Sequence, residues 1–148
     1  MTRSLAIAAA ILLAADTTPR AAETAAAPEP EHITVQHLLV GFQGSLPGKV
    51  VTRTREQAAT LANELLEKAR KGEDFDAMVK QYTDDAWPGV YSMANKGIAV
   101  GGSGEYRREG MVPAFGDVGF KLKVGEYGLA PYDPKTSPYG WHIIKRVK

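Results

Sequence analysis

Two stretches of alternating hydrophobic and polar residues predict β-strands in this chain. In the first, ITVQHLLV (33–40), His37 shares a face with isoleucine, valine and leucine. In the second, WHIIKRV (141–147), His142 shares a face with an isoleucine. Both faces of the first stretch carry aliphatic residues toward its end, so we expect a central strand. Each strand therefore presents one histidine among branched aliphatic side chains.

Two helices are predicted between these strands. The segment TRTREQAATLANELLEKARKG has apolar residues at helical spacing, with Thr54 as N-cap, Gln57 completing a capping box and Gly72 ending the helix. The segment DFDAMVKQY predicts a second, shorter helix capped by Asp74. Their apolar stripes indicate that both helices pack on a sheet.

The remaining elements are shorter. Glycines, a proline and an asparagine predict an irregular loop over residues 83–106, with a short strand starting near Gly104. A short helix is expected to open at Pro113, weakened by Gly116 and Gly119. Two strands joined by a turn end the sequence. The order strand, helix, helix, loop, strand, helix, strand, strand is typical of an α+β fold with one antiparallel sheet.

The N-terminal sequence predicts export. MTRSLAIAAAILLAA places Arg3 before an uncharged run, which is typical of a signal peptide (residues 1–15) with an undefined cleavage site. The run is shorter than the ~20 residues that span a bilayer, so we expect no membrane span in the mature form; an uncleaved anchor is the alternative. Residues 16–30 are expected to be a flexible linker and residues 31–148 one domain, in the periplasm or otherwise exported.

Composition excludes several function classes. The formal net charge is +1, and no basic stripe interleaved with aromatic residues is present, so no nucleic-acid partner is expected. Cysteine is absent, which excludes disulfides, thiolate nucleophiles and cysteine-ligated metals. A histidine pair across neighbouring strands is compatible with a hydrogen-bonded core pair, or with a zinc site if His32 supplied a third ligand.

Five segments carry a resemblance to a known family. They are, in order, VQHLLV, KARKGEDFDAMVKQYTDD, GGSGEYRREGMVPAF, LKVGEY and YGWHIIKRV. Together, over residues 33–147, they resemble a parvulin-type peptidyl-prolyl cis/trans isomerase. The resemblance implies a parvulin-like (FKBP-like) fold, in which a four-stranded antiparallel sheet is surrounded by helices.

The resemblance also implies a set of site residues. The two histidines would bond to each other at the floor of a pocket, with a serine anchoring them and a carboxylate beside them. A methionine and a phenylalanine would hold the substrate proline. The implied catalytic residues are His37, Asp85, Ser137 and His142, and the implied substrate-binding residues are Ser103, Tyr106, Met111 and Phe115.

The chemistry of proline isomerisation fits such a site. An Xaa–Pro bond isomerises unaided in tens to hundreds of seconds, because rotation breaks amide resonance. A thousandfold acceleration needs about 4 kcal/mol, which an apolar, water-excluding pocket can supply. We therefore expect a monomeric isomerase without cofactor or metal, acting on unfolded or nascent exported polypeptides. The alternative is a catalytically weak parvulin-fold chaperone or binding module for unfolded chains.

The chain departs from the family pattern at the pocket. Ser103 stands where the family usually has an apolar residue that lines the proline pocket, which predicts weaker or altered proline binding. The loop over residues 86–100 is longer than usual. This loop contains three large apolar residues, Trp87, Tyr91 and Met93. They predict a lid over the pocket, an extension of the binding groove or additional core.

Basic residues bear on the choice of substrate. The first loop and its flank carry Lys49, Arg53 and Arg55, whose spacing does not reproduce the tight basic cluster of phosphate-directed parvulins. No requirement for phosphoserine is therefore expected. Arg107 and Arg108 precede the expected pocket residues and predict some preference for an acidic residue before proline.

Overall fold

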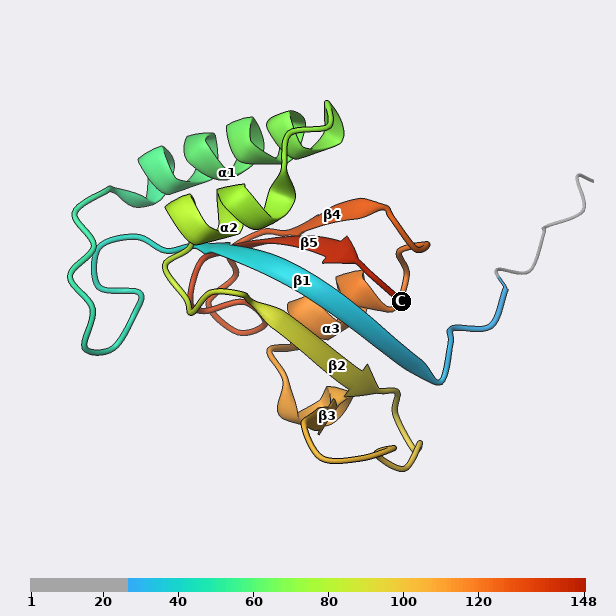
Figure 1. Cartoon of the computed structure of the whole chain (residues 1–148). Helices are drawn as coiled ribbons and strands as arrows, with labels where there is room; N and C mark the ends of the chain where they lie inside the picture. The colour runs from blue at the N-terminus through green and yellow to red at the C-terminus, as the bar shows by residue number, and fades with distance from the viewer. Residues whose placement is uncertain (1–26) are drawn as a thin grey trace, which may run out of the picture.

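The computed structural model describes residues 27–148 (Figure 1), so the expected signal peptide and most of the expected linker lie outside the described residues. The elements occur in the order β1 (His32–Val40), α1 (Arg55–Arg70), α2 (Phe75–Tyr82), β2 (Val90–Ala94), β3 (Glu105–Arg107), the 3-10 turn η1 (Arg108–Gly110), α3 (Pro113–Gly119), β4 (Tyr127–Ala130) and β5 (Trp141–Arg146). The predicted α+β class is confirmed. In the described part of the chain, no helix is long and apolar enough to cross a membrane.

The sheet has the strand order β3-β2-β1-β5-β4, with β1 at its centre as the sequence predicted. All pairs are antiparallel except β2 with β3, which is parallel. The expectation of four antiparallel strands is therefore corrected to a mixed sheet of five. The additional strand is β2, which lies within the segment predicted to be an irregular loop. The alternation of apolar and polar residues in β2 is short and is flanked by Pro88, Gly89 and Asn95, so there is no clear strand signal in the sequence there.

The two faces of the sheet pack against different helices (Figure 1). Alternation along β1 sends Leu38 and Val40 toward α1 and α2, and sends Ile33 and Val35 toward α3. All four side chains are at most 2% exposed, and burial of each stabilises the fold by roughly 1.5–3 kcal/mol. His37 lies two residues after Val35 on β1, so its side chain is on the same face as Val35, toward α3.

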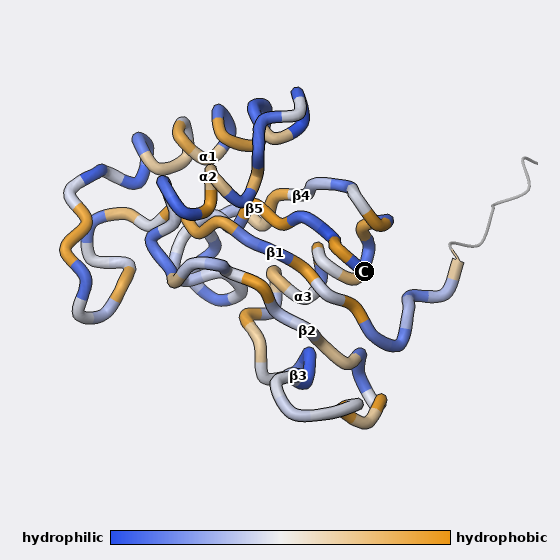
Figure 2. Tube along the Cα trace, in the orientation of Figure 1, coloured by the Kyte–Doolittle hydropathy of each residue, from blue (hydrophilic) through white to orange (hydrophobic). Residues whose placement is uncertain are grey.

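Helix α1 begins as the sequence predicts. The Thr54 hydroxyl accepts from the backbone N–H of Gln57 at 3.2 Å, and the Gln57 amide oxygen accepts from the Thr54 backbone at 2.8 Å. Asp74 caps α2 through the N–H of Ala77. Hydrophobic and hydrophilic positions alternate along α1 in Figure 2, and its buried positions are Ala58, Ala62, Leu65, Leu66 and Ala69.

The two glycines of α3 allow close packing, which corrects the expectation that they merely weaken the helix. A Cβ atom on Gly119 would lie 3.3 Å from Ile33 Cδ1 and 3.4 Å from Val35 Cγ1, so this helix turn rests directly on β1. A Cβ atom on Gly116 would lie 3.0 Å from Cγ of Arg108, whose side chain crosses the helix there. Both glycines therefore bring α3 close to its neighbours.

The structured part of the chain extends into the expected linker. The carboxylate of Glu29 accepts from the buried Arg108 guanidinium at 2.6 Å, and the backbone N–H of Asn95 donates to the carbonyl of Glu31 at 2.8 Å. Arg108 also donates to Asn95 at 2.7 Å and to Asp117 at 2.8 Å. Arg108 thus links the segment before β1, the end of β2 and helix α3.

Candidate active site

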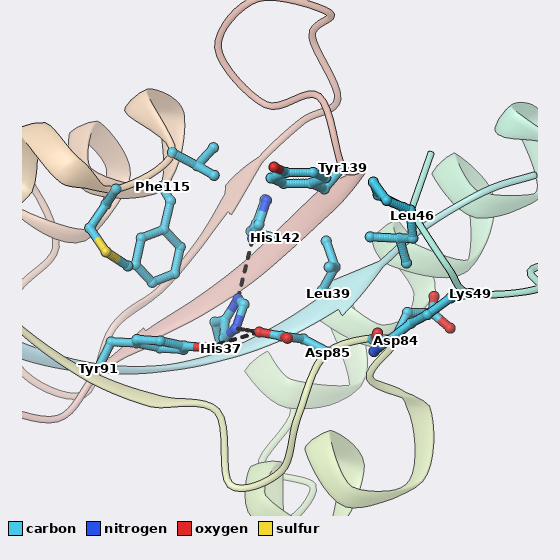
Figure 3. Close-up of a pocket in the computed structure, with 13 residues that line it drawn as sticks. His37, Leu39, Leu46, Lys49, Asp84, Asp85, Tyr91, Phe115, Tyr139 and His142 are labelled. Atoms are coloured by element: carbon cyan, nitrogen blue, oxygen red, sulfur yellow. Dashed lines mark hydrogen bonds and ion pairs between the residues drawn. The ribbon is translucent and has the colours of Figure 1, made fainter. Parts of the chain in front are cut away.

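A cavity of about 300 Å³ lies on the α3 face of the sheet (Figure 3). His37 of β1 and His142 of β5 form its polar floor. Met111, Val112 and Phe115 line it from α3 and the residues before that helix. The rest of the rim comes from β1, β2 and three loops, through Leu39, Leu46, Pro47, Lys49, Asp84, Asp85, Tyr91 and Tyr139.

The structure brings the two histidines together. In the β1–β5 register, His37 pairs with Ile144 and Leu39 pairs with His142, so the imidazoles are diagonal neighbours on one face. Their Nδ1 atoms are 3.2 Å apart and the rings stack at 5.4 Å between centroids. Each residue is only 4% exposed, so this hydrogen bond is shielded from solvent.

Asp85 completes a chain of hydrogen bonds. Its Oδ2 atom lies 3.0 Å from His37 Nε2 and accepts from the Tyr91 hydroxyl at 3.0 Å. The hydrogen bond from His37, and further that from Tyr91, lower the pKa of Asp85, although partial burial opposes the shift. An ionised Asp85 makes His37 Nε2 a donor, so the Nδ1 of a neutral His37 accepts from the Nδ1–H of His142.

His142 stays neutral over the physiological pH range. Burial, and secondarily the proximity of His37, lowers the pKa of His142 to about 3. In the tautomer set by Asp85, its Nε2 atom is an acceptor, and within the described residues this buried atom has no hydrogen-bond partner. The histidine pair is therefore a polar floor in which His142 does not take up a proton near neutral pH.

The expected proline-holding residues lie at the cavity. Phe115 is 2% exposed, and its ring packs edge-on against His37 at 5.1 Å and against His142 at 5.6 Å. Met111 follows the η1 turn and borders the same cavity. Pro113 at the start of α3 sets the first turn of the helix that presents Phe115.

The structure does not bring Ser103 and Tyr106 to this cavity. Ser103 is exposed in the loop before β3, and Tyr106 is 50% exposed on β3; neither side chain lines the cavity. Their expected place as pocket walls is therefore corrected. The cause is β2, whose pairing with β1 places Tyr91 beside the histidines and leaves β3 one strand farther out.

Ser137 has a different contact from the one expected. Its hydroxyl is fully buried and donates to the carbonyl of Gly140 at 2.8 Å, so within the described residues it closes a turn and does not bond to either imidazole. Gly140 has a φ of 138°, and a Cβ atom there would lie 2.2 Å from the carbonyl oxygen of Val40. This turn lies just before β5, which carries His142.

Sequence reasoning missed most of the cavity rim. Leu39 could have been found, because it shares a strand face with His37. Leu46, Pro47 and Tyr139 come from loops whose course carries no periodic signal. Of the large residues in the 86–100 loop, Met93 is fully buried core, Tyr91 is a cavity wall, and Trp87 is 52% exposed away from the cavity lining.

The basic residues near the cavity differ in their contacts. Lys49 donates to the backbone carbonyl of Asp84, and Arg53 forms a short ion pair with the Asp84 carboxylate. Arg108 is held by Glu29 and Asp117, outside this cavity. His32, which a zinc site would have needed as third ligand, pairs with Glu105 at 2.8 Å, and among the described residues no group of three histidine or carboxylate side chains is arranged to hold a metal ion.

Comparisons with known proteins identify one family. Residues 17–148 match the family model of the PPIC-type PPIase domain. Foldase protein PrsA of Bacillus subtilis is 39% identical over 88 residues, which cover 59% of this chain and 26% of PrsA. Chaperone SurA of Chromohalobacter salexigens is 33% identical over 113 residues, which cover 75% of this chain and 21% of SurA. The chain spans about a quarter of the length of these curated relatives.

Solved structures share the fold. Peptidyl-prolyl isomerase Ess1 from Candida albicans has a TM-score of 0.56 at 20% identity, and the match covers 80% of this chain and 63% of Ess1. The solution structure of TbPIN1 has a TM-score of 0.56 at 22% identity, with 80% and 98% of the two chains covered. The fold implied by the resemblance is thus confirmed.

Proposed function

This chain belongs to the PPIC-type PPIase, or parvulin, family, and we propose on that premise that it catalyses cis/trans isomerisation of Xaa–Pro bonds in unfolded exported polypeptides. Export is proposed from the basic residue and uncharged run of residues 1–15. The unfolded substrate is proposed from the relatives named foldase and chaperone.

The observation that carries the proposal is the apolar cavity above a buried histidine pair. A volume of about 300 Å³ is at the lower end for small-molecule sites and suits a pyrrolidine ring with its adjoining peptide atoms. Met111 and Phe115 hold the ring by dispersion and burial, while the chain before the proline remains free to turn. Rotation about the Xaa–Pro bond requires that one side of the bond is held while the other side turns.

Catalysis follows from stabilising the twisted amide without covalent chemistry. The twisted bond loses resonance and charge separation, so a cavity that excludes water disfavours the planar states more than the twisted one. The ionised Asp85 orients His37 and places negative charge beside the carbonyl that rotates. About 4 kcal/mol of differential stabilisation corresponds to a thousandfold acceleration over the uncatalysed rate.

The rim is suited to neutral side chains before proline. Arg53 is ion-paired with the Asp84 carboxylate, and Lys49, which donates to the Asp84 backbone carbonyl, is a single cation at the rim rather than a tight basic cluster for a phosphate. Leu46, Pro47 and Tyr139 offer apolar surface at the same rim. We therefore expect peptides with leucine before proline to turn over at least as well as those with phosphoserine.

Nuclear magnetic resonance exchange on proline tetrapeptides tests the proposal. The wild-type chain is expected to produce cis/trans exchange cross-peaks, and the double variant Met111→Ala/Phe115→Ala is expected to lose them. Val118→Ala is the matched control, because it truncates a partly buried residue of α3 that does not line the cavity.

The outcomes separate an isomerase from a binding module. Exchange that persists in a folded double variant would refute the assigned pocket. Absence of exchange with wild-type protein, together with suppressed aggregation of an unfolded client, would identify a binding module that uses the same fold.

A further inference from the structure

Tyr91 is one of three loop residues for which the sequence left open a lid, an extension of the groove or additional core. It lies on β2 opposite Val35 in the β1–β2 register, and alternation places it on the same face as the buried Met93. Just before β2, Gly89 lies close to β1, and its carbonyl accepts from the His37 N–H at 2.8 Å. A Cβ atom on Gly89 would lie 2.5 Å from the His37 carbonyl oxygen, so only glycine allows this approach of β2 to β1.

The Tyr91 ring is held against two other members of the site. Its centroid lies 5.2 Å from that of His37 and 5.9 Å from that of Phe115, with interplanar angles of 78° and 83°. Both are favourable edge-to-face contacts. The ring also borders the cavity, so it is one of its walls.

The Tyr91 hydroxyl has a separate contact. It donates to Asp85 Oδ2 at 3.0 Å, the same oxygen that faces His37 Nε2 at 3.0 Å (Figure 3). One carboxylate oxygen thus accepts from donors on β1 and β2, and its direction is determined by both. Burial, with the Asp85 charge, raises the pKa of Tyr91 to about 12, so the phenol remains a donor at physiological pH.

We propose that Tyr91 has two separable roles in the site: its ring is a wall of the proline-binding cavity, and its hydroxyl is a positioning group that orients Asp85 toward His37. The proposal rests on the proposed isomerase function and on the cavity that carries it. Filling the core alone would not require the hydroxyl of this tyrosine to bond to the carboxylate that faces His37.

The two roles predict different kinetic effects from two substitutions. Tyr91→Ala removes both the wall and the hydroxyl. It is expected to raise KM about three- to tenfold, as loss of an aromatic contact of about 1 kcal/mol implies, and to lower kcat at least as much as Tyr91→Phe does. Tyr91→Phe keeps the wall and is expected to leave KM within twofold while lowering kcat severalfold. The split between KM and kcat distinguishes these roles from a general loss of structure.

A pH profile tests the positioning role. The titratable groups around Asp85 are His37 on β1, Tyr91 on β2 and, at the rim, Lys49 and Asp84; His142 lies behind His37. Tyr91→Phe removes one of two side-chain donors to the carboxylate. The acid limb of kcat/KM is therefore expected to move to higher pH, which a purely structural tyrosine would not cause.

The control is Tyr127, a half-buried tyrosine on β4 that packs edge-on against Phe75 at 5.3 Å in the opposite core cluster. Tyr127→Phe and Tyr127→Ala are expected to leave kcat, KM and the pH profile within twofold of wild type. Amide spectra of all variants establish that each is folded before kinetics are compared.

Several results would overturn the proposal. Wild-type-like kinetics in both folded Tyr91 variants would refute both roles. An unchanged acid limb in Tyr91→Phe would refute positioning, and an equal rise of KM in both variants would refute the wall. If the wild type showed no turnover, a chemical-shift titration with the same proline peptide decides: weaker binding by Tyr91→Ala supports the wall although the proposed function fails, and equal or absent binding refutes it.

Discussion

Replacement of His142 by glutamine should make the protein more resistant to acid. The folded state holds this imidazole neutral, with a pKa of about 3, whereas in the unfolded chain the value is near 6.5. Between these values the unfolded state binds a proton that the folded state does not. Stability is therefore fully present above pH 6.5 and is lost as the pH falls from about 6.5 toward 3.

The magnitude follows from the same two values. At pH 4.5 an imidazole with a pKa of 6.5 gains roughly 3 kcal/mol by protonation in the unfolded chain, while the folded state gains almost nothing. Wild type should lose about 3 kcal/mol more than His142→Gln between pH 7.5 and 4.5. Both proteins retain Asp85 and His37, so the contributions of those residues largely cancel in the difference.

Urea unfolding at the two pH values, followed by tryptophan fluorescence, measures this difference. The matched control is Ile143→Val, because Ile143 is buried next to His142 on the other face of β5 and has no titratable group; this variant should lose stability in acid as the wild type does. If His142→Gln and wild type lose the same free energy on acidification, the argument for a buried neutral imidazole is wrong.

Three further predictions concern packing, the linker and the substrate. Gly119→Ala should lower the free energy of unfolding by about 1–2 kcal/mol in urea titrations, since the added methyl group lies 3.3–3.4 Å from β1; a gain would show that β1 adjusts. Glu29→Ala should cost up to about 1 kcal/mol in the same assay, because partly exposed Glu29 is a solvent-screened partner of Arg108; an unchanged value would mean that this ion pair adds no stability. Asp84→Asn should raise kcat/KM for a Glu-Pro peptide severalfold relative to a Leu-Pro peptide, by releasing Arg53; an unchanged ratio would contradict the assigned pairing.

The sequence predicted the fold where periodicity and capping act locally. The capping box at Thr54, the cap at Asp74 and the alternation around His37 each involve residues within a few positions of one another. Such signals do not depend on how the chain folds back on itself. They were sufficient for the helices, for the central strand and for a face shared by His37 with the aliphatic core.

The sequence could not predict contacts created by chain crossings. Strand β2 exists because Gly89 lets the chain approach β1 at His37, and nothing in a five-residue stretch between Pro88 and Asn95 reveals that approach. Without β2, Tyr91 has no defined face, and Ser103 is the natural candidate for a pocket wall. The partner of Ser137, likewise, depends on a turn closed three residues later.

The two faces of the sheet have unequal shares of the core, and His142 Nε2, which has no hydrogen-bond partner within residues 27–148, lies on the face with the smaller share. The α1–α2 face contains most of the large aliphatic core, whereas the α3 face combines a smaller core with the cavity and both histidines. Changes at the cavity therefore leave the larger core intact. Burial of His142 Nε2 without a partner costs free energy. Replacing the imidazole would, however, also remove the hydrogen bond between His142 Nδ1 and His37 Nδ1. That cost is consistent with a histidine pair retained for the orientation of Asp85 and the cavity floor rather than for stability.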